Sequence, residues 1–375
     1  MKYKRTILKS TALAGSVLLA CLATTAAFAD DANDHGVLYT ASNAASGNTV
    51  LVYDRAPNGV LIYAGSVSTG GLGTGGGLGN QGGVVLSHGR HFLLVVNAGS
   101  DDVTVFGVSG GQLTALSRTP SGGKTPVSVT VDDDLVYVLN AGSDNIAGFH
   151  LDASGKLKAL AGSTRPLSGT GVGAAEVKFS PGGSDLVVTE KATNRITVYP
   201  VGADGLPAAL PVITTSNGVT PFGFGFAADR SLIVSEAQGA GAGAGTVSSY
   251  HVARAGWLTT ISASVPDHHT APCWIAVTPN RRFAYTSNAH DSTISGYRVA
   301  DDGALTLLTV AGGTVSSGAG SVPTDETVAG EGRFLYAISG GNQTVVSFQI
   351  NADGTLATGP IVSGLPASAN GLAGY

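Results

Sequence analysis

Several acidic residues occupy positions from which their side chains could act on a bound ligand. Each follows or lies within a short apolar segment, and the four are Glu176, Glu190, Glu236 and Asp325. A carboxyl group in a site of limited solvent access tends to have a raised pKa, so it can exchange a proton near neutral pH. If the fold brings these residues together, they predict acid–base chemistry on a small ligand.

The adjacent pair His268-His269 is the other group with catalytic potential. Neighbouring side chains on an extended segment point to opposite sides, so the pair is poorly suited to binding one metal ion. A solvated loop is the simplest interpretation of the pair. Because His269 directly precedes an apolar segment, we keep it as a candidate catalytic residue. No other His/Asp set suggests a metal, and we expect no metal or cofactor.

A glycine-rich stretch, residues 71–76, fits the GxGxxG pattern of dinucleotide-binding sites. Such a site needs a helix after the glycines, within a βαβ unit. The apolar strand Val84-Val85-Leu86 follows instead, and no Lys-Ser/Thr pair suggests a phosphate-binding loop. We interpret this stretch as a loop between repeats.

The elements that must position these residues form a sevenfold repeat. Each unit has a short apolar strand that ends in a small or polar residue, and then a second strand that ends in an aromatic residue. The first strands end 43 to 55 residues apart, with the longest interval first, at Ser42, Asn97, Asn140, Glu190, Glu236, Asn288 and Ser339. Propeller blades have roughly 40–50 residues. The sequence therefore predicts an all-β, seven-bladed β-propeller with four antiparallel strands per blade.

The two ends of the repeat array indicate how the ring closes. The first strand, Val37 to Thr40, is of the second-position type, whereas Pro366 to Tyr375 resembles an isolated innermost strand. We expect the C-terminal strand to complete the N-terminal blade, which removes an open sheet edge. No composition break divides residues 30–375, so we predict one domain.

Repeat equivalence places several polar residues on one face of this ring. They lie at the ends of the second-position strands or at the third position of the inner strands. The predicted catalytic residues are Glu190, Glu176 and His269, and the predicted ligand-binding residues are Asn140, Glu236, Trp274, Asn288 and Asp325.

Residues 1–29 read as an export signal. A basic start precedes an apolar stretch, and Ala27-Phe28-Ala29 provides small residues for cleavage before Asp30. Lipidation at Cys21 is the alternative. We expect a periplasmic or extracellular monomer without a membrane span. Cleavage leaves Cys273 as the remaining cysteine, and its apolar surroundings predict a buried, inert thiol.

Removal of the four basic residues of this signal leaves 16 basic and 25 acidic residues, a net charge of −9. Such a surface disfavours nucleic acid or an anionic membrane as a partner. A neutral or weakly charged small molecule, or an envelope or extracellular partner, is compatible with it.

Three segments resemble the "SPDGRFLYVTNRGHDS" phrase of the lactonase family of seven-bladed propellers, which includes 6-phosphogluconolactonase and the carboxymuconate-lactonizing enzyme. They are Phe179 to Gly183, Thr278 to Ser292, and Arg333 to Phe348. The resemblance implies hydrolysis or formation of a lactone in a central pocket. It also implies a site role for Glu190, which matches the family's Asn-Glu strand end.

This chain differs from the family pattern at the positions that bind anions. Ser128 and Glu176 replace histidines of the inner strands, Ala289 replaces an arginine, and Thr324 replaces the arginine of a Pro-Arg pair. These differences argue against a phosphorylated or multiply anionic substrate. We expect a secreted lactonase-like hydrolase or cyclase. The alternative is a non-catalytic propeller that recognises a saccharide, peptide or envelope partner.

Overall fold

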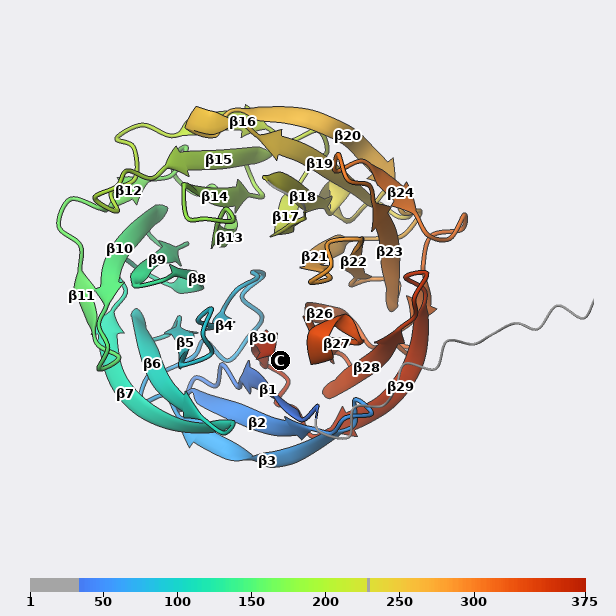
Figure 1. Ribbon diagram of the computed structural model, residues 1–375, viewed down its shortest axis with the longest axis horizontal. Coiled ribbons are helices and arrows are strands. Elements are labelled where there is room, and N and C mark those ends of the chain that lie inside the picture. Colours follow the sequence, from blue (N-terminus) through green and yellow to red (C-terminus); the bar gives the residue numbers. More distant parts are fainter. Residues whose placement is uncertain (1–33, 228–229) are drawn as a thin grey trace, which may run out of the picture. The chain divides into compact units, whose positions relative to one another are not determined.

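The computed structural model describes residues 34–227 and 230–375, and within them the chain forms seven antiparallel sheets around a central axis (Figure 1). This arrangement confirms the predicted seven-bladed β-propeller. The predicted export signal lies outside the described residues. The described residues group into one compact unit.

Blades 1 to 3 contain the following strands, named from the axis outward. Blade 1 contains β30 (Asn370–Gly374), β1 (Gly36–Ala41), β2 (Thr49–Arg55) and β3 (Leu61–Ser68). Blade 2 contains β4 (Val84–Leu86), β5 (Phe92–Asn97), β6 (Asp102–Ser109) and β7 (Gln112–Pro120). Blade 3 contains β8 (Pro126–Asp132), β9 (Leu135–Asn140), β10 (Asn145–Leu151) and an outer strand in two pieces, β11 (Leu157–Ala159) and β12 (Arg165–Pro166).

Blades 4 to 7 repeat this order. Blade 4 contains β13 (Ala174–Phe179), β14 (Asp185–Glu190), β15 (Arg195–Pro200) and β16 (Val212–Thr215). Blade 5 contains β17 (Pro221–Phe226), β18 (Ser231–Glu236), β19 (Thr246–Val252) and β20 (Leu258–Pro266). Blade 6 contains β21 (Pro272–Val277), β22 (Phe283–Asn288), β23 (Thr293–Val299), β24 (Leu305–Leu307) and β25 (Val315–Ser316). Blade 7 contains β26 (Pro323–Ala329), β27 (Phe334–Ser339), β28 (Thr344–Ile350) and β29 (Leu356–Ser363).

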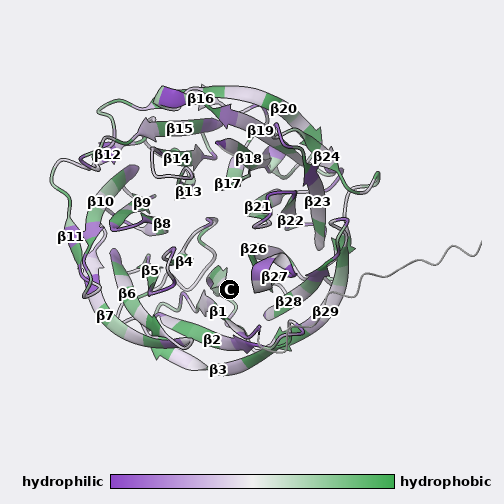
Figure 2. Cartoon of the chain, in the orientation of Figure 1, coloured by the Kyte–Doolittle hydropathy of each residue, from purple (hydrophilic) through white to green (hydrophobic). Residues whose placement is uncertain are grey.

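The core lies between adjacent blades, because both faces of the second and third strands carry apolar side chains. Between blades 2 and 3, for example, Leu94 and Val96 pack with Val136 and Val138. The outermost strands are solvated on one face, so hydrophilic and hydrophobic residues are interspersed along β3, β7 and β29 (Figure 2). This alternation is typical of half-buried antiparallel strands.

A repeated hydrogen bond joins neighbouring blades. A buried tyrosine on a second strand donates its hydroxyl proton to the carbonyl of a turn glycine in the next blade, as Tyr39 does to Gly111 at 2.8 Å and Tyr285 to Gly354 at 2.8 Å. Both glycines have positive φ angles, of 81° and 92°. Glycine adopts this conformation without the steric cost that other residues incur. The Gly-centred turns of the repeat therefore also hold the blades together.

The C-terminal strand closes the ring. β30 pairs antiparallel with β1, with Leu38 opposite Gly374 and Thr40 opposite Leu372, and the C-terminus lies beside β1 near the axis (Figure 1). The Arg55 side chain donates a hydrogen bond to the Tyr375 carbonyl at 3.0 Å. The predicted completion of the N-terminal blade by the C-terminal strand is confirmed.

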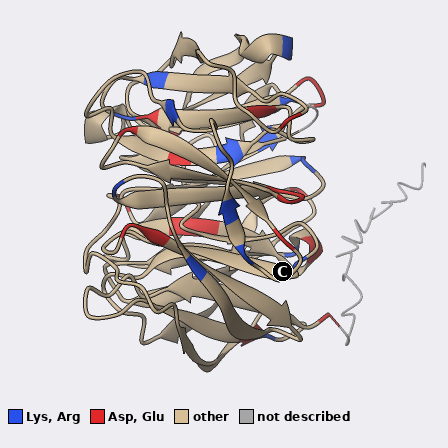
Figure 3. Ribbon diagram, turned by 90° about the vertical axis from the view of Figure 1, so that its left-hand side faces the viewer, with Lys and Arg blue, Asp and Glu red and all other residues tan. Residues whose placement is uncertain are grey.

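Helices contribute little to the described residues. They comprise the single 3-10 turns η1 (Gln238–Ala240), η2 (Arg254–Gly256) and η3 (Gly330–Gly332). Across residues 34–227 and 230–375 we find no helix with the length and hydropathy needed to cross a bilayer. Charged residues of both signs are scattered over the side of the propeller seen in Figure 3.

Candidate active site: a cavity on the propeller axis

A cavity of about 530 Å³ lies on the axis and is lined by the inner strands of all seven blades. Its lining includes three acidic residues that are almost completely buried, Glu176 on β13 and the neighbours Asp325 and Glu326 on β26. Lys178, two residues after Glu176, is the basic residue of this lining. The cavity therefore combines enclosed carboxyl groups with one ammonium group.

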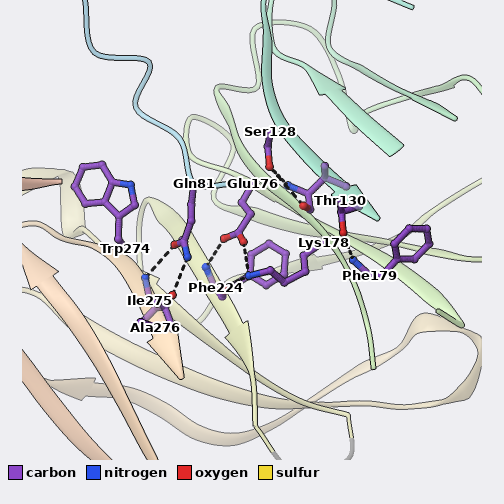
Figure 4. A network of polar contacts seen from close by, with 12 residues as sticks. Gln81, Ser128, Thr130, Glu176, Lys178, Phe179, Phe224, Trp274, Ile275 and Ala276 are labelled. Carbon is purple, nitrogen blue, oxygen red and sulfur yellow. Dashed lines mark hydrogen bonds and ion pairs between the residues drawn. The ribbon is translucent and has the colours of Figure 1, made fainter. Parts of the chain in front are cut away.

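Glu176 bridges two inner strands. A β-bulge between Ala174 and Glu176 shifts the register of β13 against β14. The Glu176 side chain reaches blade 5, where its Oε2 atom accepts a hydrogen bond from the Phe224 backbone at 2.7 Å (Figure 4). Its Oε1 atom lies 2.9 Å from the Lys178 ammonium nitrogen. Both contacts favour the charged form of Glu176.

Asp325 and Glu326 owe their placement to a second bulge. The register of β26 shifts between Thr324 and Glu326, and Asp325 takes a positive φ of 47°. Asp325 Oδ1 accepts a hydrogen bond from the Glu326 amide at 2.9 Å, and Glu326 Oε1 accepts one from the Ala276 amide at 3.1 Å. No donor of the described residues reaches Asp325 Oδ2 or Glu326 Oε2 in hydrogen-bond geometry. Each carboxyl group thus has one free oxygen.

Burial and mutual repulsion raise the pKa values of these groups. Burial, followed by the charge of Glu176, raises the pKa of Asp325 to about 8, although the amides of Glu326 and Leu372 act in the opposite direction. Burial and the Asp325 charge raise the pKa of Glu326 well above its usual range. Burial also raises the pKa of Glu176, against the opposing charge of Lys178. Asp325 can therefore be protonated at neutral pH while Glu176, beside an ammonium group, is the first to ionise.

The loop between β3 and β4 also contributes to the site, although the repeat pattern of the sequence does not predict it. The Gln81 side chain accepts a hydrogen bond from the Ile275 amide at 3.0 Å and donates one to the Ile275 carbonyl at 2.7 Å, next to Glu176 (Figure 4). The feature of the sequence that indicates an extra loop here is the interval between the ends of the first two repeat strands, which is the longest of the six. Lys178 and Glu326 were also missed, because neither lies at the repeat positions that were compared.

Two of the sequence-predicted acidic residues lie away from this cavity. Glu190 ends β14 and accepts hydrogen bonds from Thr193, Thr197, and both the amide and hydroxyl of Ser168. Glu236 ends β18 and accepts five, from Ser216, Gly218, Thr246, Ser248 and Ser264. Both side chains are fully buried, and neither is among the residues that line the cavity.

The remaining sequence-predicted residues are dispersed. Asn140 and Asn288 end β9 and β22 and donate hydrogen bonds within or beside their own blades. His269 pairs with Asp291 at 3.2 Å, and Trp274 donates to the Asn80 carbonyl at 2.7 Å. Of the eight predicted side chains, the structure brings Glu176 and Asp325 together in the cavity lining.

No His, Cys, Asp and Glu cluster with the geometry of a metal site is found in the described part of the chain. Cys273 is buried, and burial raises the pKa of its thiol to about 12 although the charge of Lys191 acts in the opposite direction. At neutral pH its thiol is protonated and a poor nucleophile, as expected from its apolar surroundings.

Comparison with known proteins supports the same family. The family profile "Lactonase, 7-bladed beta-propeller" matches residues 26–165. None of the proteins of curated function matches the sequence.

Solved structures extend the likeness over almost the whole chain. A Lactobacillus plantarum protein has a TM-score of 0.73 at 17% identity, and covers 91% of this chain and 99% of its own. A candidate 6-phosphogluconolactonase of Bacteroides fragilis has a TM-score of 0.71 at 16% identity, with 92% and 99% covered. A periplasmic gluconolactonase of Pseudomonas aeruginosa has a TM-score of 0.70 at 16% identity, with 91% and 99% covered. At these identities the likeness shows a shared fold. The family profile and the seven blades thereby support the resemblance seen in the sequence, and the chain is a seven-bladed β-propeller similar to those of the lactonase family.

Proposed function

We propose that the protein hydrolyses a small lactone, or forms one by the reverse reaction, in the cavity on the propeller axis. The observation that carries this proposal is the enclosed trio Glu176, Asp325 and Glu326, with the pKa of Asp325 raised to about 8. Two carboxyl groups whose environments favour different protonation states can divide the roles of base and acid between them.

In the hydrolytic direction, ionised Glu176 takes a proton from water as that water attacks the lactone carbonyl. The Lys178 ammonium group stabilises the negative charge that develops on the carbonyl oxygen. When the ring C–O bond breaks, protonated Asp325 gives its proton to the departing ring oxygen, so the product is a hydroxy acid. Asp325 then regains the proton that Glu176 accepted, through the water of the cavity.

We further propose that this reaction takes place outside the cytoplasm, on a ligand without phosphate. Residues 1–29 read as an export signal, and the Pseudomonas aeruginosa neighbour of the same fold is a periplasmic protein. The lining of the cavity offers a single lysine and no arginine. A phosphorylated sugar acid would leave charge unpaired in such a site.

The direct test is hydrolysis of a lactone panel between pH 5 and pH 9 by the wild type, Glu176→Gln and Asp325→Asn. Loss of a general acid or base should lower kcat by about 10²- to 10⁴-fold. The matched control is Asp301→Asn, which removes an exposed carboxyl group and should leave the rate unchanged. If the wild type hydrolyses none of the lactones, or if both variants retain its rate, the enzymatic proposal is wrong.

A further inference from the structure

One end of the axial cavity is closed by the chain itself. Residues 79–82, here called the crossing segment, precede β4 and extend over the N-terminal ends of the other inner strands (Figure 1). Asn80 contacts blades 1, 3 and 6. Its side chain accepts a hydrogen bond from Asn370 at 2.8 Å and donates one to the Val127 carbonyl, and its own carbonyl accepts one from Trp274.

Gln81 and Gly79 extend the closure to blades 4 and 6. The Gln81 amide donates to the Ala175 carbonyl at 3.1 Å, its side chain pairs with Ile275, and Lys191 donates to the Gly79 carbonyl. A Cβ atom at Gly223 of blade 5 would lie 2.0 Å from Gln81 Oε1 and 2.7 Å from the Cys273 carbonyl oxygen, so a larger residue here would displace the Gln81 side chain and strain the backbone. The side chains of Asn80 and Gln81 are buried. The crossing segment therefore seals the N-terminal end of the channel.

The opposite end of the cavity, where each inner strand turns into the next strand of its blade, is partly exposed. This hairpin end shows in the burial patterns of β8, β17 and β21, whose first five residues are buried and whose remaining residues are half-buried. The cavity lining continues past the ends of the strands to Pro181, which is exposed. A ligand can reach the carboxyl groups from this side.

Polarity changes along the route. At the hairpin end the half-buried polar lining residues are Asp132, Lys178 and Thr327, and six further half-buried lining residues are apolar, namely Val85, Leu86, Val131, Phe226, Val277 and Val328. The Glu176 carboxyl group lies deeper, near Gln81 of the crossing segment (Figure 4), whose amide donates to the carbonyl of the adjacent Ala175. Asp325 and Glu326 are almost completely buried and lie before the half-buried Thr327 on β26. A ligand with hydroxyl groups at both ends would bury some of them against apolar side chains, which costs free energy unless they find partners.

From this geometry we infer that the ligand enters at the hairpin end with its polar head first, and that the substrates are lactones with an apolar substituent. The crossing segment, through Gln81, limits how deep the lactone ring can go. The apolar substituent stays against the hairpin-end side chains. This inference rests on the proposed function, since it assigns the substrate class of the same cavity.

The first test measures binding rather than turnover. Its probes are 2-pyrrolidinone and its 5-alkyl derivatives from methyl to pentyl, which are lactams that mimic the ring and resist hydrolysis. Each methylene buried against the hairpin end should tighten Kd by about two- to fourfold, from the roughly 0.8 kcal/mol gained per buried CH₂ group. A Kd that does not change along the series would overturn the inference.

The second test blocks the hairpin end. Thr327 lines the cavity there and is half-buried, so Thr327→Trp should weaken binding of the pentyl lactam at least tenfold. Thr259→Trp, at an exposed position of the outer strand β20, is the matched control and should bind as the wild type does. Tight binding to a folded Thr327→Trp protein contradicts the proposed entrance. If that variant does not fold, the lactam series alone decides.

Turnover separates the two proposals. Lactones with alkyl substituents should be hydrolysed with a higher kcat/KM than glucono-δ-lactone, which has several hydroxyl groups. Hydrolysis that favours glucono-δ-lactone supports the proposed function and refutes the substrate class. Tighter binding along the lactam series with no lactone hydrolysed supports the substrate class and refutes the catalytic proposal.

Discussion

The propeller contains two sets of buried carboxyl groups, and they differ in their surroundings. Glu190 and Glu236 end second-position strands and accept four and five hydrogen bonds, mainly from serine and threonine hydroxyls. Asp325 and Glu326 lie on an inner strand, and each has an oxygen without a donor among the described residues. Burial alone therefore does not make a carboxyl group reactive.

The number of donors decides what a buried carboxyl group does. Hydrogen bonds to the charged form compensate for lost hydration, whereas a carboxyl group without them keeps its proton to higher pH. Glu190 and Glu236 are placed to brace the blade, because their partners lie on neighbouring strands and on the loops that follow. Asp325 and Glu326 line the cavity, and each has one carboxyl oxygen that can accept a hydrogen bond from a ligand. The predictions below compare the two sets.

The largest effect on stability is expected for Glu236, one of the two carboxyl groups that accept hydrogen bonds from several donors. Glu236→Ala leaves the Gly218 amide and four hydroxyl groups without their acceptor. Buried donors without a partner cost about 1–3 kcal/mol each, and the hydroxyls can partly reorient, so we expect a loss of roughly 3–5 kcal/mol in the free energy of unfolding. Urea denaturation measures it. Glu326→Gln should change the same quantity by less than about 1 kcal/mol, and an equal loss in both variants would remove the distinction.

The next effect is the pH dependence of stability caused by Asp325. Its pKa is about 8 in the folded protein and about 3.9 in an unfolded chain. Because the folded state holds the proton more tightly, the contribution of Asp325 to stability is fully present below about pH 4 and is lost progressively as the pH rises toward 8. Asp325→Asn should remove this contribution and raise Tm relative to the wild type at pH 8. A variant with the same pH dependence as the wild type would show that Asp325 ionises normally.

The smallest effect concerns a single donor. Ser168→Ala removes one hydroxyl donor from Glu190 but keeps the hydrogen bond from the Ser168 amide. A hydrogen bond to a charged group contributes about 1.5–3 kcal/mol, and the remaining donors moderate its loss, so we expect roughly 1–2 kcal/mol of destabilisation. Thr327 lines the cavity and donates no hydrogen bond to Glu190, so Thr327→Val should leave Tm unchanged. A neutral Ser168→Ala variant would mean that Glu190 is held by its other partners.

Most of the fold could be predicted from the repeat. The two strands predicted to end at Asn97 and Asn140 end at these residues in the structure. The closing strand was predicted from Pro366 onward and begins at Asn370. These features are local, because an apolar segment and its turns recur in each unit.

The residues of the candidate site could be predicted less well from the repeat than the strands could. Repeat equivalence places Glu190, at a strand end, and Glu176, on an inner strand, on the same face of the ring. In the structure, however, Glu190 accepts hydrogen bonds from hydroxyls such as that of Thr197 in its own sheet, whereas the Glu176 side chain reaches the next inner strand. Asp325 lies on a bulge, where one extra residue redirects the side chains. Gln81 comes from an insertion without a counterpart in the other repeats. Contacts that arise once in the chain leave no periodic signal.

The protonation state of Asp325 decides whether this residue can act as the acid in the cavity. Carbon-13 NMR of the side-chain carboxyl groups, with Asp325→Asn to assign the resonance, follows its titration from pH 3 to pH 10. The account predicts a midpoint near pH 8, with the carboxyl group protonated at pH 6. A midpoint below pH 5 would contradict the account, because Asp325 would then have no proton to give to a leaving oxygen at neutral pH.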